Sequence, residues 1–201
     1  MAKTAIVVTP SSMKEFYKIA DELKDKSGGF EYELIAVLEY SEVDDNDKMG
    51  KCIWCEVPSS TSITAKRNIG RYLVSEGTKY LIFLGEKELP INKKWLTDRI
   101  RGFEVEPVLG IIGKLAEPVD MKIQDTLLKK LRNFIHILDE DFYERCCLKD
   151  KTFRYVEEDS IATTVKVFDL IGGFSVTAEY PNLEYNARVQ SLGYGLLPQP
   201  E

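Results

Sequence analysis

The stretch that decides the fold runs from Ile63 to Leu96 and reads ITAKRNIGRYLVSEGTKYLIFLGEKELPINKKWL. Apolar residues near helical spacing open it, and Ser62 stands before them as a candidate N-cap. Gly77 is expected to end this helix. The unbroken apolar run Tyr80–Leu84 follows, which is typical of a strand covered on both faces. The stretch therefore predicts a helix, a buried strand, an acidic loop and a second helix.

The acidic loop directly follows this buried strand, as Gly85, Glu86, Lys87 and Glu88. In open parallel sheets, ligands bind in the crevice outside the carboxyl ends of the strands. Carboxylate oxygens are also the ligands that hard divalent cations prefer. We therefore expect a metal ion or a charged substrate to be held at this loop.

The chain before and after this stretch alternates strands and helices. An expected strand at Thr4–Thr9 is followed by a helix with a capping box formed by Ser12 and Glu15. Further strands are expected at three ranges: Tyr32–Leu38, Lys51–Val57 and Pro107–Gly113. A strand, helix and strand at this spacing form a right-handed βαβ unit. The first 113 residues therefore predict a mostly parallel, doubly wound α/β sheet.

The second half of the sequence is less regular. An amphipathic helix is expected at Met121–Leu138, and His136, the only histidine, lies in it. One histidine cannot form a catalytic triad or a typical zinc site, so a solvated or capping ring is favoured. Later elements are expected at three ranges: a strand at Ile161–Val167, a helix at Asn182–Leu192 closed by Gly193, and a strand at Tyr194–Leu197.

The composition is that of a soluble globular protein. The chain has 201 residues, 44% apolar and 30% charged, with a net charge of -6, and we expect one domain. It lacks a Lys/Arg stripe with interleaved aromatics, so nucleic acid is not an expected partner. No apolar run approaches the roughly 20 residues that span a bilayer, and the N-terminus lacks a signal-peptide pattern. These features predict a cytoplasmic location.

The four cysteines are Cys52, Cys55, Cys146 and Cys147. The first pair has redox-motif spacing, but it lies in a strand-like run rather than at a helix N-terminus, where a thiolate would be activated. The second pair is vicinal, which is poor geometry for two ligands of one metal. Structural thiols are favoured over a disulfide, and a disulfide over zinc.

Three segments form one ordered pattern: AKRNIG at Ala65–Gly70, YLIFL with Pro90 and Trp95-Leu96, and IGGF with Arg188 and Gly193-Tyr194. Together they resemble a GT-A fold glycosyltransferase of the family 2 type. Ala65–Gly70 (AKRNIG) is similar to the family's A-R-N-x-G helix start. Tyr80–Leu84, Pro90 and Trp95-Leu96 stand where the family has a strand, a D-x-D loop, a Pro and a Trp-Leu pair. The last segment, Ile171–Phe174 (IGGF) with Arg188 and Gly193-Tyr194, resembles the family's G-G-F, helix and G-Y. The small size is similar to that of GT-A proteins of some archaeal viruses, which would imply the host cytoplasm.

This resemblance implies a function and a set of ligands. It implies transfer of a sugar from a UDP- or GDP-type nucleotide sugar to an unknown acceptor, such as a protein or glycan, with Mn²⁺ or Mg²⁺ at the diphosphate. Residues 1–113 would be the nucleotide-binding half and residues 114–201 the acceptor half. A homo-oligomer is also compatible with it. The implied nucleotide-sugar contacts are Thr9, Pro10, Ser11, Glu39, Lys66, Arg67, Asn68 and Lys87.

The sequence departs from the family at both acidic motifs. Where the family has D-x-D, this chain has Gly85-Glu86-Lys87, so Glu86 and Glu88 are the candidate metal ligands and Lys87 is an alternative positive charge. The strings Asp44–Asp47 and Asp139–Asp141 also contain D-x-D, and both are interpreted as solvated charge.

The second departure concerns the catalytic base. Pro181-Asn182 replaces the family's E-D pair, and Asn cannot take a proton from an acceptor hydroxyl. Glu179 and Glu184 are the candidate catalytic bases, and Glu179 is favoured because it precedes the helix. Two hypotheses remain: an active glycosyltransferase, or a catalytically degenerate GT-A-like module that binds sugar nucleotides or serves assembly.

Overall fold

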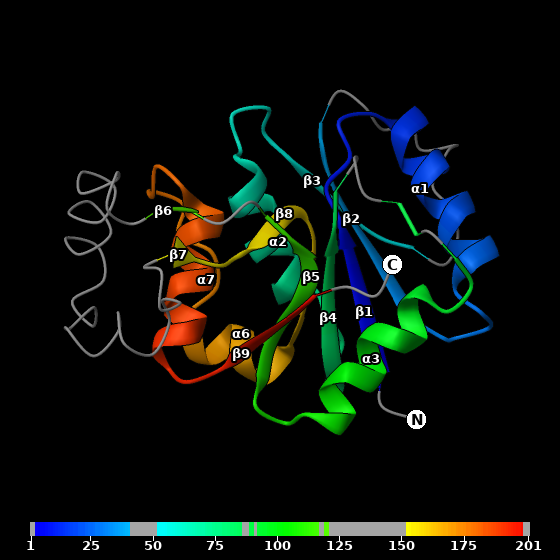
Figure 1. Cartoon of the computed structure of the whole chain (residues 1–201). Coiled ribbons are helices and arrows are strands. Elements are labelled where there is room, and N and C mark those ends of the chain that lie inside the picture. The colour runs from blue at the N-terminus through cyan, green and yellow to red at the C-terminus, as the bar shows by residue number, and fades with distance from the viewer. Residues whose placement is uncertain are drawn as a thin grey trace.

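The computed structural model describes residues 3–40, 52–85, 89–90, 92–116, 119–120 and 152–198. A seven-stranded sheet in the order β3-β2-β1-β4-β8-β5-β9 forms its centre, and β6 and β7 form a separate two-stranded ribbon (Figure 1). The strands of the sheet are β1 Lys3–Val8, β2 Glu33–Glu39, β3 Cys52–Val57, β4 Thr78–Leu84, β5 Leu109–Leu115, β8 Val156–Thr164 and β9 Gly195–Pro198; those of the ribbon are β6 Val119–Asp120 and β7 Thr152–Phe153.

The sheet is mostly parallel, as the sequence predicts. Strands β3, β2, β1 and β4 pair in parallel, and β9 pairs in parallel with β5. Strand β8 is antiparallel to both of its neighbours, with Leu84 of β4 opposite Ser160 and Leu115 of β5 opposite Val156. The carboxyl ends of β1 to β5 and the start of β8 therefore lie along one edge, the carboxyl edge of the sheet.

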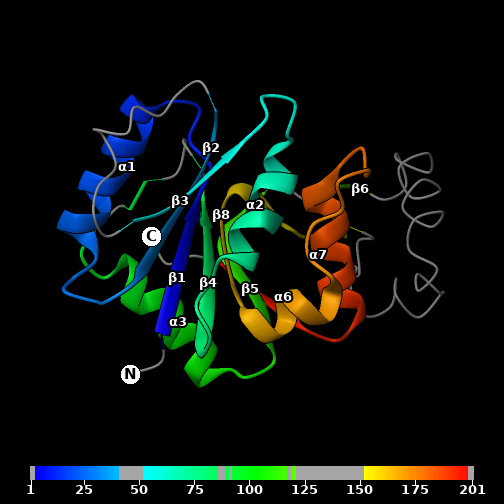
Figure 2. The same cartoon turned by 180° about the vertical axis from the view of Figure 1, so that it is seen from behind.

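Helices cover both faces of the sheet. Helices α1 (Met13–Lys26) and α3 (Trp95–Val105) lie on one face (Figure 1). Helices α2 (Ile63–Tyr72), α6 (Val165–Ile171) and α7 (Pro181–Ser191) lie on the other, as the view from behind shows (Figure 2). In the part of the chain that the structure describes, no helix is long and apolar enough to cross a membrane.

Each face of the sheet has its own apolar cluster because successive strand residues point to opposite sides. In β1, Ile6 and Val8 pack with Phe16 of α1, whereas Ala5 and Val7 belong to the cluster under α2, α6 and α7. Helix α2 lies so close to β1 that a Cβ on Gly70 would come 2.3 Å from Val7 Cγ1. Only glycine fits there.

Helix α1 confirms its predicted start. The Ser12 hydroxyl accepts from the Glu15 N–H at 3.3 Å, and Ser27 ends the helix, followed by Gly28 with a φ of +65°. The reciprocal bond of the capping box is shifted by one residue. The Glu15 carboxylate accepts from the Ser11 N–H at 2.7 Å and the Ser11 hydroxyl at 2.8 Å.

The predicted end of helix α2 is wrong. The helix ends at Tyr72 with Leu73 as its C-cap, and Gly77 lies in the following turn with a φ of +80°. The Leu73 and Val74 side chains still pack against the apolar cluster, although they are no longer helical. Apolar spacing alone could not distinguish a helical turn from the compact turn that leads into β4.

The predicted strand at Ile161–Val167 is wrong at its carboxyl end. Strand β8 ends at Thr164, and residues 165–167 begin α6, which the sequence interpretation missed. The β-branched run favours a strand, but the Thr164 hydroxyl accepts from the Val167 N–H at 3.1 Å and caps a helix instead. The expected helix and strand near the C-terminus are both present within about a residue or two, as α7 and β9.

Cys52 and Cys55 are free thiols, which agrees with the favoured prediction. They are three residues apart on β3, so they contact the clusters on opposite faces of the sheet. Burial raises the pKa of the Cys52 thiol to about 12, which disfavours a reactive thiolate. Several predicted features of the chain lie outside the described residues, among them Asp44–Asp47, Met121–Leu138 with His136, Asp139–Asp141, Cys146 and Cys147.

Candidate functional site

An ion pair lies at the carboxyl edge of the sheet. Glu39 is the last residue of β2, and its Oε1 lies 3.1 Å from Nζ of Lys66 on α2. Lys66 is 5% exposed. A buried ammonium is stable only with a compensating partner, which Glu39 supplies. The pair brings two of the predicted nucleotide-sugar contacts together.

Helix α2 turns polar residues toward the rest of the protein. Its buried positions are Thr64, Lys66, Arg67 and Gly70, whereas Ile63 is 51% exposed. The Arg67 guanidinium lies over the ring of Phe174, 5.5 Å from its centroid. Two cationic side chains are thus buried on one helix near the strand ends. Ammonium and guanidinium groups in such a place can bind phosphate or carboxylate oxygens.

The residues after β1 divide into two groups. Thr9 and Pro10 are buried and directly follow β1, whose last residue, Val8, pairs with Leu84 at the end of β4. Ser11 is exposed, and its N–H and hydroxyl both bond to Glu15. Ser11 thus contributes to the start of α1 in this structure, while Thr9 and Pro10 line the carboxyl edge.

Asn68 has its partner in a distant loop. Its Nδ2 donates to the Phe174 carbonyl at 2.8 Å, and its Oδ1 accepts from the Phe174 N–H at 2.9 Å. The side-chain amide is therefore engaged by the protein backbone. Sequence spacing contained no signal for this contact, because the two residues are 106 positions apart.

Glu179 lies in the segment that leads from Phe174 into α7, and it is exposed. The start of α7 is fixed to the sheet: Asn182 Nδ2 donates to the Val156 carbonyl at 2.7 Å. Val156 pairs with Leu115 at the carboxyl end of β5. The segment with Glu179 therefore meets the same edge of the sheet as Glu39.

Glu184 is in a very different environment. It is 4% exposed on α7, and its Oε2 accepts from Nη2 of Arg188 at 2.7 Å. Arg188 also donates to the Gly173 carbonyl at 2.7 Å and to the Ile171 carbonyl. The Glu184 carboxylate is thus part of a buried ion pair that braces the turn after α6.

Two residues without a predicted role support this arrangement. Asn186 is fully buried, and its Oδ1 accepts from the Val156 N–H at 2.9 Å. Arg188 links α7 to the turn at Gly173. A polar residue on the inner side of the predicted helix was the available signal for Asn186, but nothing in the sequence identified its partner.

The candidate metal ligands Glu86 and Glu88, and the alternative charge Lys87, lie outside the described residues. Within the described ranges, no group of three or more His, Cys, Asp or Glu side chains could hold a metal ion. Lys66, which is paired with Glu39, and Arg67 are two buried cationic side chains near the carboxyl edge in these ranges.

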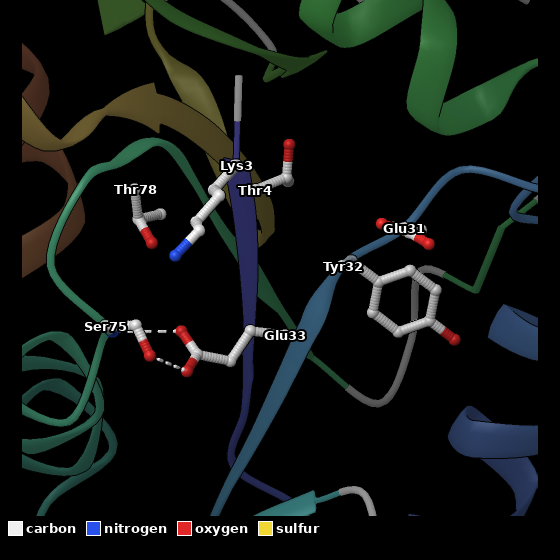
Figure 3. A pocket seen from close by; sticks show the side chains of 7 residues that line it. All are labelled: Lys3, Thr4, Glu31, Tyr32, Glu33, Ser75 and Thr78. Carbon is white, nitrogen blue, oxygen red and sulfur yellow. Dashed lines mark hydrogen bonds between the residues drawn. The ribbon is translucent and has the colours of Figure 1, made fainter. Parts of the chain in front are cut away.

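A cavity of about 270 Å³ lies at the opposite edge of the sheet, where β1, β2 and β4 begin. Lys3, Glu33 and Thr78 are the first residues of these strands (Figure 3). The Glu33 carboxylate already accepts from the Ser75 hydroxyl and, at 3.0 Å, from its N–H. This cavity is therefore separate from the candidate site.

Comparison with known proteins gives matches among solved structures. No family model matches the sequence, and no curated protein matches it. The mannosyltransferase PcManGT from Pyrobaculum calidifontis, solved with GDP-Man and Mn²⁺, has a TM-score of 0.66 at 12% identity, over 100% of this chain and 55% of its own. A Drosophila galactosyltransferase 7 mutant, solved with manganese, UDP-Gal and xylobiose, has a TM-score of 0.57 at 12% identity, over 100% of this chain and 66% of its own.

The chain has the GT-A fold. It spans 55% and 66% of these two glycosyltransferases, less than two thirds of either. The 4-diphosphocytidyl-2C-methyl-D-erythritol synthase from Anaerococcus prevotii also matches, with a TM-score of 0.52 at 10% identity, over 97% of this chain and 87% of its own. Since identities this low show the fold alone, the GT-A likeness leaves the roles of Glu39, Lys66, Arg67 and Glu179 as predictions.

Proposed function

We propose that this GT-A protein transfers a sugar from a nucleoside-diphosphate sugar to an acceptor, as a glycosyltransferase. The observation that supports this most is the burial of Lys66 and Arg67 on α2, near the carboxyl edge of a GT-A sheet. A diphosphate needs compensating positive charge at that edge. The structures of the two glycosyltransferases described above contain GDP-Man or UDP-Gal, which supports a donor of this class.

In the proposed complex the donor lies across the ends of β1 and β2. Thr9, Pro10 and Ser11 would border the nucleoside, and Glu39 would accept hydrogen bonds from its base or ribose. Lys66 and Arg67 would bind the diphosphate through charge-assisted hydrogen bonds. Residues 1–113 would accordingly form the donor half and residues 114–201 the acceptor half. The acceptor is proposed to be a protein or glycan.

The proposed base is Glu179. It would remove the proton of the acceptor hydroxyl, whose oxygen attacks the anomeric carbon as the bond to the diphosphate breaks, giving inversion. The nucleoside diphosphate leaves with the bonding electrons, and Lys66 and Arg67 stabilise its added charge. Glu179 is favoured over Glu184 because the Glu184 carboxylate is buried in an ion pair with Arg188.

Mn²⁺ or Mg²⁺ remains part of the proposal through the acidic loop. If Glu86 and Glu88 hold such an ion, it would add positive charge at the diphosphate; Lys87 is the alternative charge there. Both glycosyltransferase structures contain manganese, which supports testing for it. The chemistry assigned to Glu179, Lys66 and Arg67 does not depend on which alternative holds.

A second candidate function is a GT-A-like binding module without catalysis. Asn182 stands where the resemblance places the base, and its amide donates to the Val156 carbonyl. A backbone-bound amide at this position favours a structural role for it. The module would bind sugar nucleotides through the same α2 residues and would turn none of them over.

Ligand binding is the first test. We expect a nucleoside diphosphate, UDP or GDP, to raise the thermal unfolding midpoint of the protein, since ligand at a hundredfold excess over Kd adds about 2.7 kcal/mol. Titration calorimetry with UDP, GDP, UDP-Gal and GDP-Man, each with Mn²⁺ and with EDTA, then gives the affinities. Absence of binding by all four under both conditions would contradict the proposed donor class.

Matched lysine variants locate the binding site. Lys66→Met should weaken binding of the preferred diphosphate about tenfold or more, because a charge-assisted bond to phosphate is lost. Lys79→Met is the control, because Lys79 is exposed near the start of β4 at the other edge. Equal affinities in the two variants would remove Lys66 from the site. Full turnover by Glu179→Gln would remove Glu179 as the base, and binding without any turnover would favour the module.

A further inference from the structure

The side chain of Asn68 makes both hydrogen bonds that the backbone of Phe174 offers. It donates to the Phe174 carbonyl at 2.8 Å and accepts from the Phe174 N–H at 2.9 Å. A neighbouring strand bonds to a residue in the same reciprocal way. The amide therefore replaces a strand partner for the loop between α6 and α7, and it does so from the helix that carries Lys66 and Arg67.

The local backbone is shaped around this contact. Gly173 has a φ of +74°, which favours glycine. A Cβ at this position would also lie 2.7 Å from Asn68 Oδ1 and 3.1 Å from Phe168 Cε1. The loop thus approaches Asn68 at a point where no larger residue fits. This explains the second glycine of the Gly172-Gly173-Phe174 segment.

The Phe174 side chain is fixed as well. It is 2% exposed, and its ring lies 4.5 Å from the Tyr185 ring and 5.2 Å from the Phe83 ring, measured between centroids. Arg67 covers it from α2. Backbone and side chain of Phe174 are therefore both held, so the loop has a defined starting point.

The far end of the loop is held by a second asparagine. Asn182, at the start of α7, donates to the Val156 carbonyl at the start of β8. Between these two points, the Ser175 hydroxyl accepts from the Ala178 N–H at 3.2 Å and closes a compact turn. Glu179 follows this turn directly. Its position relative to α2 therefore depends on both held ends of the loop, Phe174 and Asn182.

We propose that Asn68 is a positioning residue for the loop that carries Glu179, and that it does not bind the nucleotide. This inference rests on the proposed function, in which Glu179 meets the acceptor hydroxyl. Removing the amide leaves a buried N–H and carbonyl at Phe174 without these partners. The loop then loosens, and a displacement of about 1 Å can reduce a rate about a hundredfold. Donor binding remains, because Lys66 and Arg67 keep their places.

Hydrogen–deuterium exchange of the full chain tests the contact itself. In Asn68→Ala we expect the amides of residues 174–180 to exchange about tenfold faster or more, which corresponds to the loss of buried hydrogen bonds. Arg71→Ala is the matched control on the same helix. Its guanidinium pairs with Asp169 of α6 and not with this loop, so residues 174–180 should keep their exchange rates. Unchanged loop exchange in Asn68→Ala would overturn the proposal.

Kinetics distinguish positioning from binding. Asn68→Ala should lower kcat about tenfold or more while KM for the donor and Kd for UDP and GDP stay within about twofold. A higher Kd with unchanged loop exchange would make Asn68 a nucleotide ligand and overturn the inference. If the unmodified protein binds no nucleotide, the proposed function fails. In that case faster loop exchange would support the hold of Asn68 on the loop, and unchanged exchange would overturn it.

A conservative variant controls for a general loss of folding. Asn68→Asp keeps an oxygen that accepts from the Phe174 N–H and loses the donor to its carbonyl. We expect loop exchange and kcat between those of the unmodified protein and Asn68→Ala. If both variants had the circular dichroism spectrum and the activity of the unmodified protein, the positioning role would be excluded.

Discussion

The two faces of the sheet are held by different kinds of contact. Against the face of α1 and α3, residues such as Phe16 and Leu23 pack into an aliphatic and aromatic cluster. Polar contacts among the described residues of this face are fewer: the buried Arg99 lies over the Trp95 ring, and the Tyr80 hydroxyl donates to Glu104. On the face of α2, α6 and α7, apolar packing is joined by polar links between the elements. These links run from Asn68 to Phe174, from Arg71 to Asp169, from Arg188 to Gly173, and from Asn186 to Val156.

This difference suggests that one face mainly stabilises the sheet, whereas the other also sets the positions of the loops. Apolar packing is non-directional and scales with buried area, so one face can stabilise the sheet without fixing any particular group. Hydrogen bonds and ion pairs are directional, and leaving a buried partner unpaired is costly. The second face therefore suits the loops that carry the proposed site. Variants on the first face should change stability, and variants that remove a buried polar link on the second should also change loop positions.

Phe16→Ala should give the largest loss of stability. Phe16 is fully buried, and its ring lies 4.5 Å from the Trp54 ring, measured between centroids. Truncating a buried Phe leaves a cavity and reduces the free energy of unfolding by about 3–5 kcal/mol. Urea unfolding measures this loss, with Ile19→Val as a mild control expected at about 0.5–1.5 kcal/mol. Exchange of residues 174–180 at low temperature should stay unchanged; a local increase there would show that the faces are not separable.

Asn186→Ala should have an intermediate effect on the other face. The Val156 N–H would lose its acceptor in a fully buried setting, at a cost of about 1–3 kcal/mol. Chemical unfolding measures the loss, and hydrogen exchange should locate it at the start of β8 and α7. The control is Gln190→Ala, because Gln190 is partly exposed and bonds to the Arg154 carbonyl at 3.0 Å. A loss in Asn186→Ala no larger than in this control would contradict the importance of directional links on this face.

The same contrast explains which parts of the fold the sequence predicts. Apolar patterns identify β1, β2 and β4 and the inner residues of α1, because burial in these elements follows hydrophobicity. On the face of α2, α6 and α7 the patterns mislead. Helix α2 buries Lys66 and Arg67 and exposes Ile63. Helix α6 begins within a run of β-branched residues, which is typical of a strand. Hydrophobic period cannot identify an inward-facing charge whose partner comes from another element.

The candidate site shows the same limit. The sequence brings Glu39 and Lys66 to one place, because the order of strands and helices alone predicts that strand ends meet. It gives no partner for Asn68, Ser11 or Glu184, since each of these is engaged through geometry that only the folded chain creates. Residue type therefore indicates where a group lies better than what it contacts.

Arg71→Ala should have the smallest effect. The Arg71 guanidinium donates to both Asp169 oxygens, at 2.9 and 2.6 Å, and so joins α2 to α6. The Asp169 side chain is 51% exposed, so solvent and salt weaken the pair, and its loss should cost about 0.2–1 kcal/mol. A double-mutant cycle with Asp169→Ala measures this coupling free energy.

Salt then tests whether the Arg71 link differs in kind from the buried ones. The Arg71–Asp169 coupling should shrink in about 1 M NaCl, where the Debye length is near 3 Å. The loss in Asn186→Ala should not change with salt, because Asn186 and Val156 are uncharged and buried. A salt-independent coupling above about 2 kcal/mol at Arg71 would show that an exposed pair orders this face as strongly as the buried amides. In that case, the placement of the Glu179 loop would depend on the contact of α2 with α6 as well as on Asn68.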